Sequence, residues 1–311
     1  MNDKKILITG GLGFIGSYIA DELIDENEVL IIDNKSTGKV ENLQNINHEN
    51  LTLIEKDLND ADLDDILTDV DYVFHLAAMA SVPLSIENPS ECIENNMDAT
   101  IKLINACKNN NVKKIIFSSS SSVYGDNTNI PLKESEYPLP KSPYAASKAS
   151  GELFLKTYYE AYGLNYISLR YFNVFGPKQD KNSQYAAVIP NFITALLEGE
   201  QPIIYGDGEQ TRDFIYIRDV VNANIKAAES DYNGIINVAS GKKTTINELY
   251  KIISETLGSN IEPKYLPERK GDIKHSLADV NNMKKIDYKV NLNDFENQLK
   301  ETINWFKTKL E

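Results

Sequence analysis

The chain has 311 residues, of which 41% are hydrophobic and 25% are charged, and its formal net charge is −14. This length and composition are typical of a large α/β unit or of two domains. The acidic balance excludes a general nucleic-acid-binding surface, which needs basic patches. We therefore expect no nucleic acid as a partner. No apolar run approaches the roughly 20 residues that span a bilayer, so we expect no membrane as a partner either.

In chain order, the first half alternates short apolar runs with helical patterns. Such near-continuous apolar runs predict strands of a parallel sheet that is covered on both faces. These strands are expected at 4–9, 28–33, 51–56, 71–77, 113–119 and 165–171. Helices are expected between them, at 15–26, 94–109 and 144–162. The alternation predicts an α/β fold with a doubly wound, mostly parallel Rossmann sheet.

The regularity fades after about residue 172, where prolines and the loop "YGDGEQTRD" interrupt the chain. One more strand is expected at 235–240. Apolar residues at helical spacing near the C-terminus predict a helix packed on the core: Leu292, Phe295, Leu299, Ile303 and Phe306. We therefore expect an NAD-binding domain at 1–172, to which about 213–241 returns, and a smaller substrate-binding α/β region at 173–212 and 242–311.

The cysteines and histidines show no metal-binding pattern. Cys92 and Cys107 have neither a CxxC nor a zinc spacing, so we expect two buried reduced thiols. No histidine has ligand spacing, and His75 is expected to be a hydrogen-bonded structural residue. The N-terminal lysines and apolar residues superficially resemble a signal peptide, but glycines interrupt them and a helical pattern follows. These observations predict a cytoplasmic protein without a metal.

A glycine-rich loop, "ITGGLGFIG", follows the first predicted strand and opens the first predicted helix. Gly10 or Gly11, with Gly13 and Gly16, fits the dinucleotide fingerprint. Glycines there allow a tight turn and a close approach of the backbone to a pyrophosphate, which the N–H groups of the helix then bind. A turn that serves packing alone is the weaker alternative.

Acidic residues follow the next two strands. Asp33 ends the second strand about 20 residues after Gly13, where a carboxylate accepts hydrogen bonds from both ribose hydroxyls and repels a 2′-phosphate. NAD is therefore favoured over NADP. Asp57 and Leu58 follow the third strand, where the adenine edge is expected, although an Asp at such a place is also a common helix cap.

The stretch "SPYAASK" places Tyr144 and Lys148 four residues apart, on one face of a helix. A phenol has a reference pKa near 10, which is too high for a base at neutral pH. A nearby ammonium stabilises the phenolate, and an oxidised nicotinamide adds a second positive charge. Together the two charges would make Tyr144 a general base.

The run "SSSSSVYG" looks like a linker, yet it directly follows the apolar run "KKIIF". The serines therefore end a buried strand at the carboxyl edge of the sheet, where ligands bind in such folds. The alternative to a chemical role is that the serines merely end the strand.

At this point the chain resembles the extended short-chain dehydrogenase/reductase family, and within it the nucleotide-sugar 4-epimerases. The resemblance covers nearly the whole chain and is carried by "TGGLGFIG", "KDL", "HLAA", "NNMDAT", "FSSSSSVYG", "SPYAASK", "RYFNVFGP", "GDGEQTRDFIYIRDV" and "RKGDIKHS". It implies a Ser-Tyr-Lys reaction centre, a bound NAD and a UDP-hexose substrate. Aligned on Val-Tyr-Gly, the catalytic serine is Ser120, which would bond the sugar's 4-oxygen beside Tyr144, with Lys148 as the third catalytic residue.

The same resemblance implies the two binding sites. The NAD site comprises Gly10, Gly13, Phe14, Ile15, Gly16, Asp33, Asn34, Gly38, Asp57, Leu58, Leu76, Ala77, Ala78, Asn96, Ser118, Tyr144, Lys148 and Phe172. The UDP-sugar site comprises Ser81, Val82, Ser120, Ser121, Ser122, Tyr144, Asn173, Val188, Ile203, Tyr205, Arg212, Arg269 and Ser276. The two arginines would bind the diphosphate, because forked guanidinium groups suit that task. As alternatives, Asn96 is a helix cap and Tyr205 is part of the core.

Neighbouring branches differ at the serine run. Dehydratases of the family place an Asp-Glu pair just after the catalytic serine or threonine, and UDP-glucuronate decarboxylases place a Glu before Val-Tyr-Gly. Here Ser121 and Ser122 occupy these positions. Without such a carboxylate, return of the hydride is the simplest fate of a 4-keto sugar, and this predicts epimerisation. A UDP-glucuronate 4-epimerase, a sister dehydratase or decarboxylase, and a catalytically silent NAD-binding regulator are the alternatives.

The resemblance also suggests a substrate range and an oligomer. Ser276 falls where relatives carry either a bulky aromatic or a small residue, and a serine there would leave room for an acetamido group. UDP-glucose, UDP-galactose and their N-acetylated counterparts are then all expected as substrates. A homodimer is expected through the helices at 94–109 and 144–162, where Tyr158, Tyr159 and Tyr162 offer apolar area.

Overall fold

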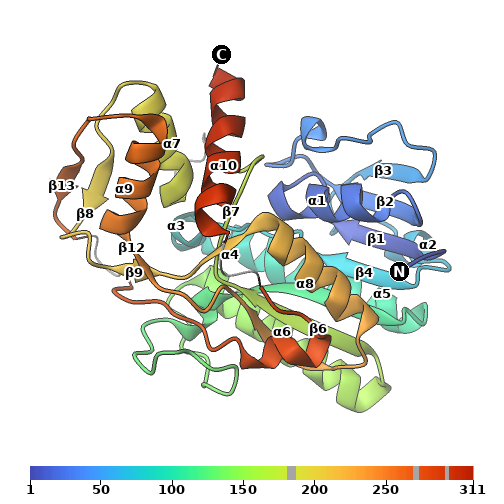
Figure 1. Ribbon diagram of the computed structural model, residues 1–311. Helices are drawn as coiled ribbons and strands as arrows, with labels where there is room; N and C mark the ends of the chain where they lie inside the picture. The colour runs from blue at the N-terminus through green and yellow to red at the C-terminus, as the bar shows by residue number, and fades with distance from the viewer. Residues whose placement is uncertain (181–186, 269–272, 291–293, 311) are drawn as a thin grey trace.

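The computed structural model describes residues 1–180, 187–268, 273–290 and 294–310 (Figure 1). A seven-stranded sheet forms its centre, in the order β11-β6-β5-β4-β1-β2-β3, and every pairing in it is parallel. Its strands are β1 (Lys5–Thr9), β2 (Glu28–Asp33), β3 (Leu51–Glu55), β4 (Tyr72–His75), β5 (Lys114–Ser120), β6 (Asn165–Tyr171) and β11 (Gly234–Val238). The predicted doubly wound sheet is confirmed. Its strand order reverses between β1 and β4, so the ligand crevice is expected at the carboxyl ends of these strands.

Helices cover both faces of the sheet (Figure 1). Side chains alternate along each strand, so Ile6 and Ile8 of β1 pack on one face and Leu7 packs on the other. The first face carries α1 (Phe14–Leu23) and α8 (Ile217–Glu229). The second face carries α2 (Leu63–Ile66), α5 (Ala99–Asn109) and α6 (Pro143–Tyr162).

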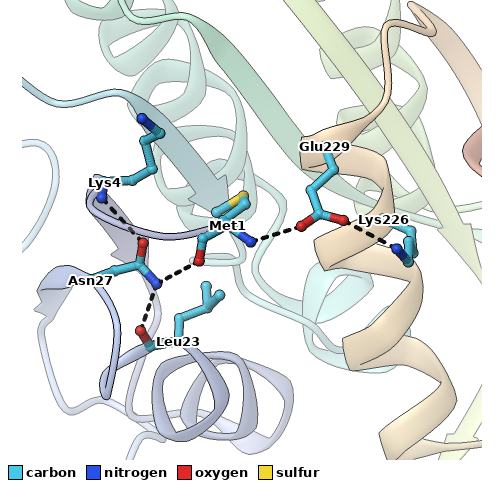
Figure 2. A network of polar contacts seen from close by, with 6 residues as sticks. All are labelled: Met1, Lys4, Leu23, Asn27, Lys226 and Glu229. Atoms are coloured by element: carbon cyan, nitrogen blue, oxygen red, sulfur yellow. Dashed lines mark hydrogen bonds and ion pairs between the residues drawn. The ribbon is translucent and has the colours of Figure 1, made fainter.

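Helix α1 ends at Leu23, earlier than the expected range of 15–26. The side-chain amide of Asn27 donates to the carbonyl oxygens of Leu23, at 2.8 Å, and of Met1, at 3.2 Å (Figure 2). The terminal ammonium of Met1 in turn donates to the Glu229 carboxylate at 2.7 Å (Figure 2). This network takes up the last carbonyl of α1 and joins the start of the chain to the end of α8.

The segment before α5 is more complex than the predicted helix at 94–109. Two short helices, α3 (Val82–Glu87) and α4 (Pro89–Ile93), precede a wide π-helical turn, η2 (Glu94–Asp98). Such turns often occur at functional sites. Elsewhere in the described residues lie the 3₁₀ segments η1 (Val40–Asn42), η3 (Ser121–Tyr124) and η4 (Asn281–Ile286).

The second half adds a smaller layered region beside the sheet (Figure 1). Helices α7 (Val188–Leu197), α9 (Ile246–Leu257) and α10 (Phe295–Leu310) pack together, and their buried side chains continue the core of the α1 and α8 face. The sequence did not predict three short pairs, which are too short for a periodic pattern. They are β7 (Asn173–Phe175) with β10 (Phe214–Tyr216), β8 (Ile203–Tyr205) with β13 (Lys264–Leu266), and β9 (Thr211–Arg212) with β12 (Thr244–Thr245).

Several smaller predictions can be compared with this structure. The C-terminal helix is confirmed by the buried side chains of Leu299, Ile303 and Phe306, whereas Leu292 lies outside the described residues. Cys92 and Cys107 are buried and unpaired, as expected. In the described part of the chain, no helix is long and apolar enough to cross a membrane, and no three potential metal ligands cluster.

Candidate active site

The glycine loop joins β1 to α1 at the point where the strand order reverses. Gly10 has a φ of +69°, and a Cβ atom there would lie 2.8 Å from the backbone nitrogen of Ala77. A Cβ atom at Gly16 would lie 2.3 Å from the Gly10 carbonyl oxygen. Helix α1 begins at Phe14 without a side-chain cap on its first turn, among the residues described. This tight loop before an uncapped helix start fits a pyrophosphate.

Asp33 lies at the end of β2, directly against this loop. Its carboxylate accepts the backbone N–H groups of Leu12, at 3.0 Å, and Lys35, at 2.8 Å. A Cβ atom at Gly38 would lie 2.8 Å from a carboxylate oxygen of Asp33, so the loop that carries Asn34 and Gly38 wraps closely around the acid. The structure thus brings the glycine loop and the predicted ribose-binding acid together.

The loop that follows β3, where the adenine edge of NAD is predicted, is held in place by hydrogen bonds. The side-chain amide of Asn34 donates to the Asp57 carboxylate at 2.7 Å. Lys102 of α5 donates to the carbonyl oxygens of Leu58, at 3.3 Å, and Asn59, at 2.7 Å. Asp57 and Leu58 therefore lie in a loop that α5 supports, beside the end of β2.

The loop after β4 is held against the end of β1. The hydroxyl of Thr9 accepts the backbone N–H groups of Leu76 and Ala77, each at 3.2 Å. The His75 ring bonds the Thr9 hydroxyl at 2.7 Å and the Thr100 hydroxyl at 2.8 Å. Burial lowers the pKa of His75 to about 3. His75 is thus a neutral structural histidine, as predicted, and it helps to place Leu76, Ala77 and Ala78.

Asn96 lies in the π-helical turn, and its amide is fully engaged with protein groups. Its oxygen accepts the backbone N–H of Met79 at 2.7 Å, and its nitrogen donates to the Ser147 hydroxyl at 3.1 Å and toward the Cys92 thiol at 3.5 Å. These bonds join the loop after β4 to α6. Contact between Asn96 and a nicotinamide stays a prediction.

Each described serine of the run at 118–122 has a different environment. The hydroxyl of Ser118 lies 3.1 Å from that of Tyr171, and Ser119 donates to the Glu152 carboxylate at 2.5 Å. Ser120, the last residue of β5, accepts the backbone N–H of Ser122 at 3.1 Å, and its hydroxyl lies close enough to the phenol of Tyr144 to act on the pKa of that phenol. The Ser122 hydroxyl is buried without a hydrogen-bond partner among the described residues. Of the run, Ser120 is the serine placed beside the predicted base.

Tyr144 and Lys148 lie on one face of α6, in its first two turns. The Lys148 ammonium lies 5.9 Å from the ring centre of Tyr144 and 5.0 Å from that of Phe117. Burial raises the pKa of Tyr144, and the hydrogen bond with Ser120 opposes this rise. Burial also lowers the pKa of Lys148 to about 8. The net effect of the protein on the pKa of Tyr144 is therefore a rise, and the predicted base depends on a second positive charge beside it.

The predicted substrate side begins at Asn173, whose backbone N–H and side-chain amide both donate to the carbonyl oxygen of Asp213, at 3.1 and 3.0 Å. The carboxylate of Asp213 accepts the N–H and hydroxyl of Ser240, at 2.8 and 2.7 Å, and the N–H of Ala278, at 3.1 Å. Burial raises the pKa of Asp213 to about 6, although these bonds oppose the rise. Asp213 joins three segments around Asn173 and Arg212.

The remaining predicted residues differ in their surroundings. Ser276 is buried, and its backbone N–H donates to the Thr211 carbonyl oxygen at 3.1 Å, which places it beside Arg212. Arg269 lies outside the described residues. Phe172 is buried against Tyr124, while Ser121 is partly exposed. The others lie at the starts of elements or on β8: Ser81 and Val82 at α3, Ile15 in α1, Val188 at α7, and Ile203 and Tyr205 in β8.

The sequence analysis missed Asp213, Glu152 and Arg170. Two of them carried a readable signal. Arg170 is a charge inside the otherwise apolar run "NYISLRY", and a buried arginine requires an anionic partner. Glu152 follows Lys148 by four residues, so it continues the face of Tyr144 and Lys148.

Comparisons with known proteins agree with this arrangement. The sequence model of the NAD dependent epimerase/dehydratase family matches residues 6–239. A putative UDP-glucose 4-epimerase of Methanocaldococcus jannaschii is 40% identical over 306 residues, which cover 97% of this chain and 98% of that protein. The solved UDP-N-acetylglucosamine 4-epimerase from Methanobrevibacter ruminantium M1, in complex with UDP-N-acetylmuramic acid, is 65% identical with a TM-score of 0.99, over 99% of this chain and 100% of that one. The UDP-glucose 4-epimerase of Thermotoga maritima, solved with UDP-glucose, is 40% identical with a TM-score of 0.93, over 99% of this chain and 100% of that one. This chain belongs to the NAD dependent epimerase/dehydratase family.

Proposed function

We propose that this protein is an NAD-dependent UDP-hexose 4-epimerase, an isomerase that inverts C4 of the sugar through a transient 4-keto intermediate. The observation that carries the proposal is the grouping of Ser120 beside the phenol of Tyr144, with the ammonium of Lys148 5.9 Å from the Tyr144 ring centre on the same helix face. The family match and the similarity to two 4-epimerase structures support it.

The residues would divide the work as follows. Ser120 bonds the sugar's 4-oxygen, and Tyr144 removes the proton from that oxygen and later returns it. The ammonium of Lys148 stabilises the phenolate. NAD, when bound, would supply the hydride acceptor for C4 of the sugar. NAD would lie on the glycine loop and α1, with its ribose on Asp33.

The polar residues of the second half would hold the UDP group. We infer that Asn173, Arg212 and Arg269 bind the diphosphate while Ile203 and Tyr205 flank the uracil. The exposed side chain of Ile203, on a strand of the smaller region, supports this placement. Strong binding of the nucleotide would keep the 4-keto sugar in the site while it turns over. The smaller region, 173–212 with 242–311, would then be the substrate-binding unit.

The serines at 121 and 122 favour epimerisation over the sister reactions. A dehydratase or decarboxylase needs a carboxylate beside the 4-keto sugar, and the described groups after Ser120 are hydroxyls. The small, buried Ser276 and the similarity to a UDP-N-acetylglucosamine 4-epimerase support N-acetylated substrates beside UDP-glucose and UDP-galactose.

We further infer a homodimer and a cytoplasmic location. Helix α6 exposes Leu153, with 64% of its surface accessible, and Tyr162, with 61%, and Ile93 of α4 is 51% exposed. Several large exposed apolar side chains on neighbouring helices are typical of a protein–protein interface. The unpaired thiols of Cys92 and Cys107 are compatible with a reducing compartment.

Proton NMR of the purified protein with a panel of UDP-sugars and no added NAD tests the proposed function. Interconversion of UDP-glucose with UDP-galactose, or of the N-acetylated pair, is expected. If UDP-glucuronate and its C4 epimer are the one pair that interconverts, the protein is a UDP-glucuronate 4-epimerase and the proposed substrate class is wrong. Release of carbon dioxide or accumulation of a 4-keto-6-deoxy sugar would overturn the reaction type.

A further inference from the structure

A buried polar cluster of four residues includes side chains from the same strand and helix that carry Ser120 and Tyr144. Arg170 of β6 makes a forked pair with Glu152 of α6, with Nε 2.9 Å from Oε1 and Nη2 2.7 Å from Oε2. Ser119 of β5 donates to the same Oε1 at 2.5 Å. The guanidinium of Arg170 also lies 4.6 Å from the ring centre of Tyr124. We call Ser119, Tyr124, Glu152 and Arg170 the Glu152 cluster.

The cluster contacts both elements that carry the Tyr144–Ser120 pair. On α6, Tyr144, Lys148 and Glu152 follow one another at four-residue spacing, so Glu152 lies on the face of the catalytic pair. On β5, Ser119 immediately precedes Ser120. The ion pair therefore fixes α6 against β5 and β6 about two turns from Tyr144.

The other flank of Ser120 is joined to the same cluster. Tyr124 ends η3, the short segment that starts directly after Ser120, and its hydroxyl donates to the side-chain oxygen of Asn237 of β11 at 2.6 Å. Asn237 is itself fixed, because its backbone N–H donates to Glu134 at 2.8 Å. Ser120 is thus held from both sides along the chain.

The ion pair of Glu152 and Arg170 is buried, so its contribution to stability must be weighed against its contribution to geometry. Arg170 and Glu152 are 1% and 3% exposed, respectively. Taking two charges out of water is unfavourable, and apolar residues of similar volume commonly give equal or greater stability. A forked arginine–carboxylate pair, however, fixes both distance and orientation, which apolar packing does not.

We propose that Glu152 and Arg170, with Ser119, are positioning residues that set α6 on the sheet so that the phenol of Tyr144 meets the hydroxyl of Ser120. The inference rests on the proposed function and assigns a role to residues outside the substrate and cofactor sites. A displacement of the reacting groups by about 1 Å lowers rates by roughly 100-fold, so small shifts of α6 would be felt in kcat.

The test compares Ser119→Ala and the double variant Glu152→Met/Arg170→Met with the wild type. Ser168→Ala is the matched control, because Ser168 is a buried serine of the adjacent strand β6 whose hydroxyl has no partner among the described residues. We expect kcat to fall tenfold or more in the double variant and several-fold in Ser119→Ala, with the Kd for UDP unchanged and the Tm of the double variant near that of the wild type. Ser168→Ala should keep the wild-type kcat.

A second readout does not depend on turnover. In protein labelled with ¹³Cζ-tyrosine, the resonance that is lost in Tyr144→Phe reports the Tyr144 phenol, and we expect it to shift in both cluster variants but not in Ser168→Ala. An inactive wild type with these shifts would contradict the proposed function and leave the positioning role supported. A folded double variant with wild-type kcat and an unshifted resonance would overturn the inference. If the double variant does not fold, an unshifted resonance and unchanged kcat in Ser119→Ala overturn it.

Discussion

The hydroxyl of Ser120, the last residue of β5, lies beside the phenol of Tyr144, in the first turn of α6, and opposes the rise that burial causes in the pKa of that phenol. The pair unites residues that are 24 positions apart in sequence. It gives the phenol a partner on the sheet edge where ligands bind in this fold. The pair is where we expect the proton transfer of the proposed reaction.

Replacing Tyr144 by phenylalanine removes the proton-transfer group and keeps the ring. We expect kcat to fall by about 10²- to 10⁴-fold, while the Kd for UDP, measured by calorimetry, stays within twofold of the wild type. Tyr137→Phe is the control, because Tyr137 is 80% exposed in a loop. Equal turnover in Tyr144→Phe and wild type would remove this residue from the mechanism.

Lys148 should limit stability while it serves catalysis. Burial lowers its pKa to about 8, whereas a lysine of the unfolded chain keeps its proton to about pH 10.4. Between these values the folded chain binds fewer protons, so this group adds stability as the pH rises from 8 to 10. At pH 7 the buried ammonium is unfavourable by up to about 3 kcal/mol.

Lys148→Met should be inactive, because it lacks the ammonium that stabilises the phenolate. It should also be more stable than the wild type at pH 7, because the buried charge is gone. The stability difference, from urea unfolding, should shrink as the pH rises to 10, because the wild type loses its buried charge. A variant that is less stable than the wild type at pH 7, or a difference that does not vary with pH, would contradict this assignment.

Asp213 should act on substrate binding. Its carboxylate holds Ser240 and Ala278 while its carbonyl oxygen holds Asn173, the predicted diphosphate ligand. In Asp213→Asn an NH₂ group faces N–H donors, and a lost hydrogen bond to a charged group is worth about 1.5–3 kcal/mol. We expect the KM for the UDP-sugar to rise tenfold or more with kcat nearly unchanged. The surface variant Asp64→Asn is the control. A wild-type KM in Asp213→Asn would contradict a role of Asp213 in substrate binding.

Ser276 is expected to set the width of the sugar pocket. Its side chain is buried beside Thr211 and Arg212. In the proposed sugar pocket, an aromatic ring at this position would crowd the group on C2 of the sugar. Overpacking is typically unfavourable by about 1–3 kcal/mol. Ser276→Tyr should lower kcat/KM for the N-acetylated pair roughly tenfold or more relative to the plain sugars. If the ratio of the two values does not change, Ser276 is not the gate.

The exposed apolar side chains of α6 predict the effect of a charge on assembly. Leu153 is 64% exposed in the middle of the helix. In a dimer across this face, Leu153→Asp would bury an unpaired carboxylate and should shift the protein to a monomer at micromolar concentration. Light scattering distinguishes the two forms. A wild type that is already monomeric would refute the proposed dimer.

Much of the sheet was predictable because its strands are buried on both faces and read as apolar runs. The strand β6 matches its predicted range of 165–171, and β5 extends only one residue beyond 113–119. The pair β9 and β12 was not predictable, since two residues carry no period. Helix α1 ended earlier than expected because Asn27, a residue outside the helix, takes the carbonyl of Leu23.

The site was predictable where a motif fixes local geometry, as at Gly10 and Asp33, which the fold brings together. Burial was not predictable from spacing. The four-residue separation of Tyr144 and Lys148 suggested a lowered phenol pKa, but burial outweighs the opposing effect of Ser120 and raises the pKa of Tyr144. The role of Asp213 was not predictable, because its partners, Ser240 and Ala278, are distant in the sequence.

The most direct test of the account follows the hydrogen on C4. UDP-glucose or UDP-N-acetylglucosamine that carries deuterium at C4 is incubated with the purified protein, without added NAD, and the products are examined by NMR and mass spectrometry. The account predicts the C4 epimer with the deuterium retained at C4, because the hydride that leaves returns to the same carbon. Loss of the label to solvent, or a product other than the C4 epimer, would contradict it.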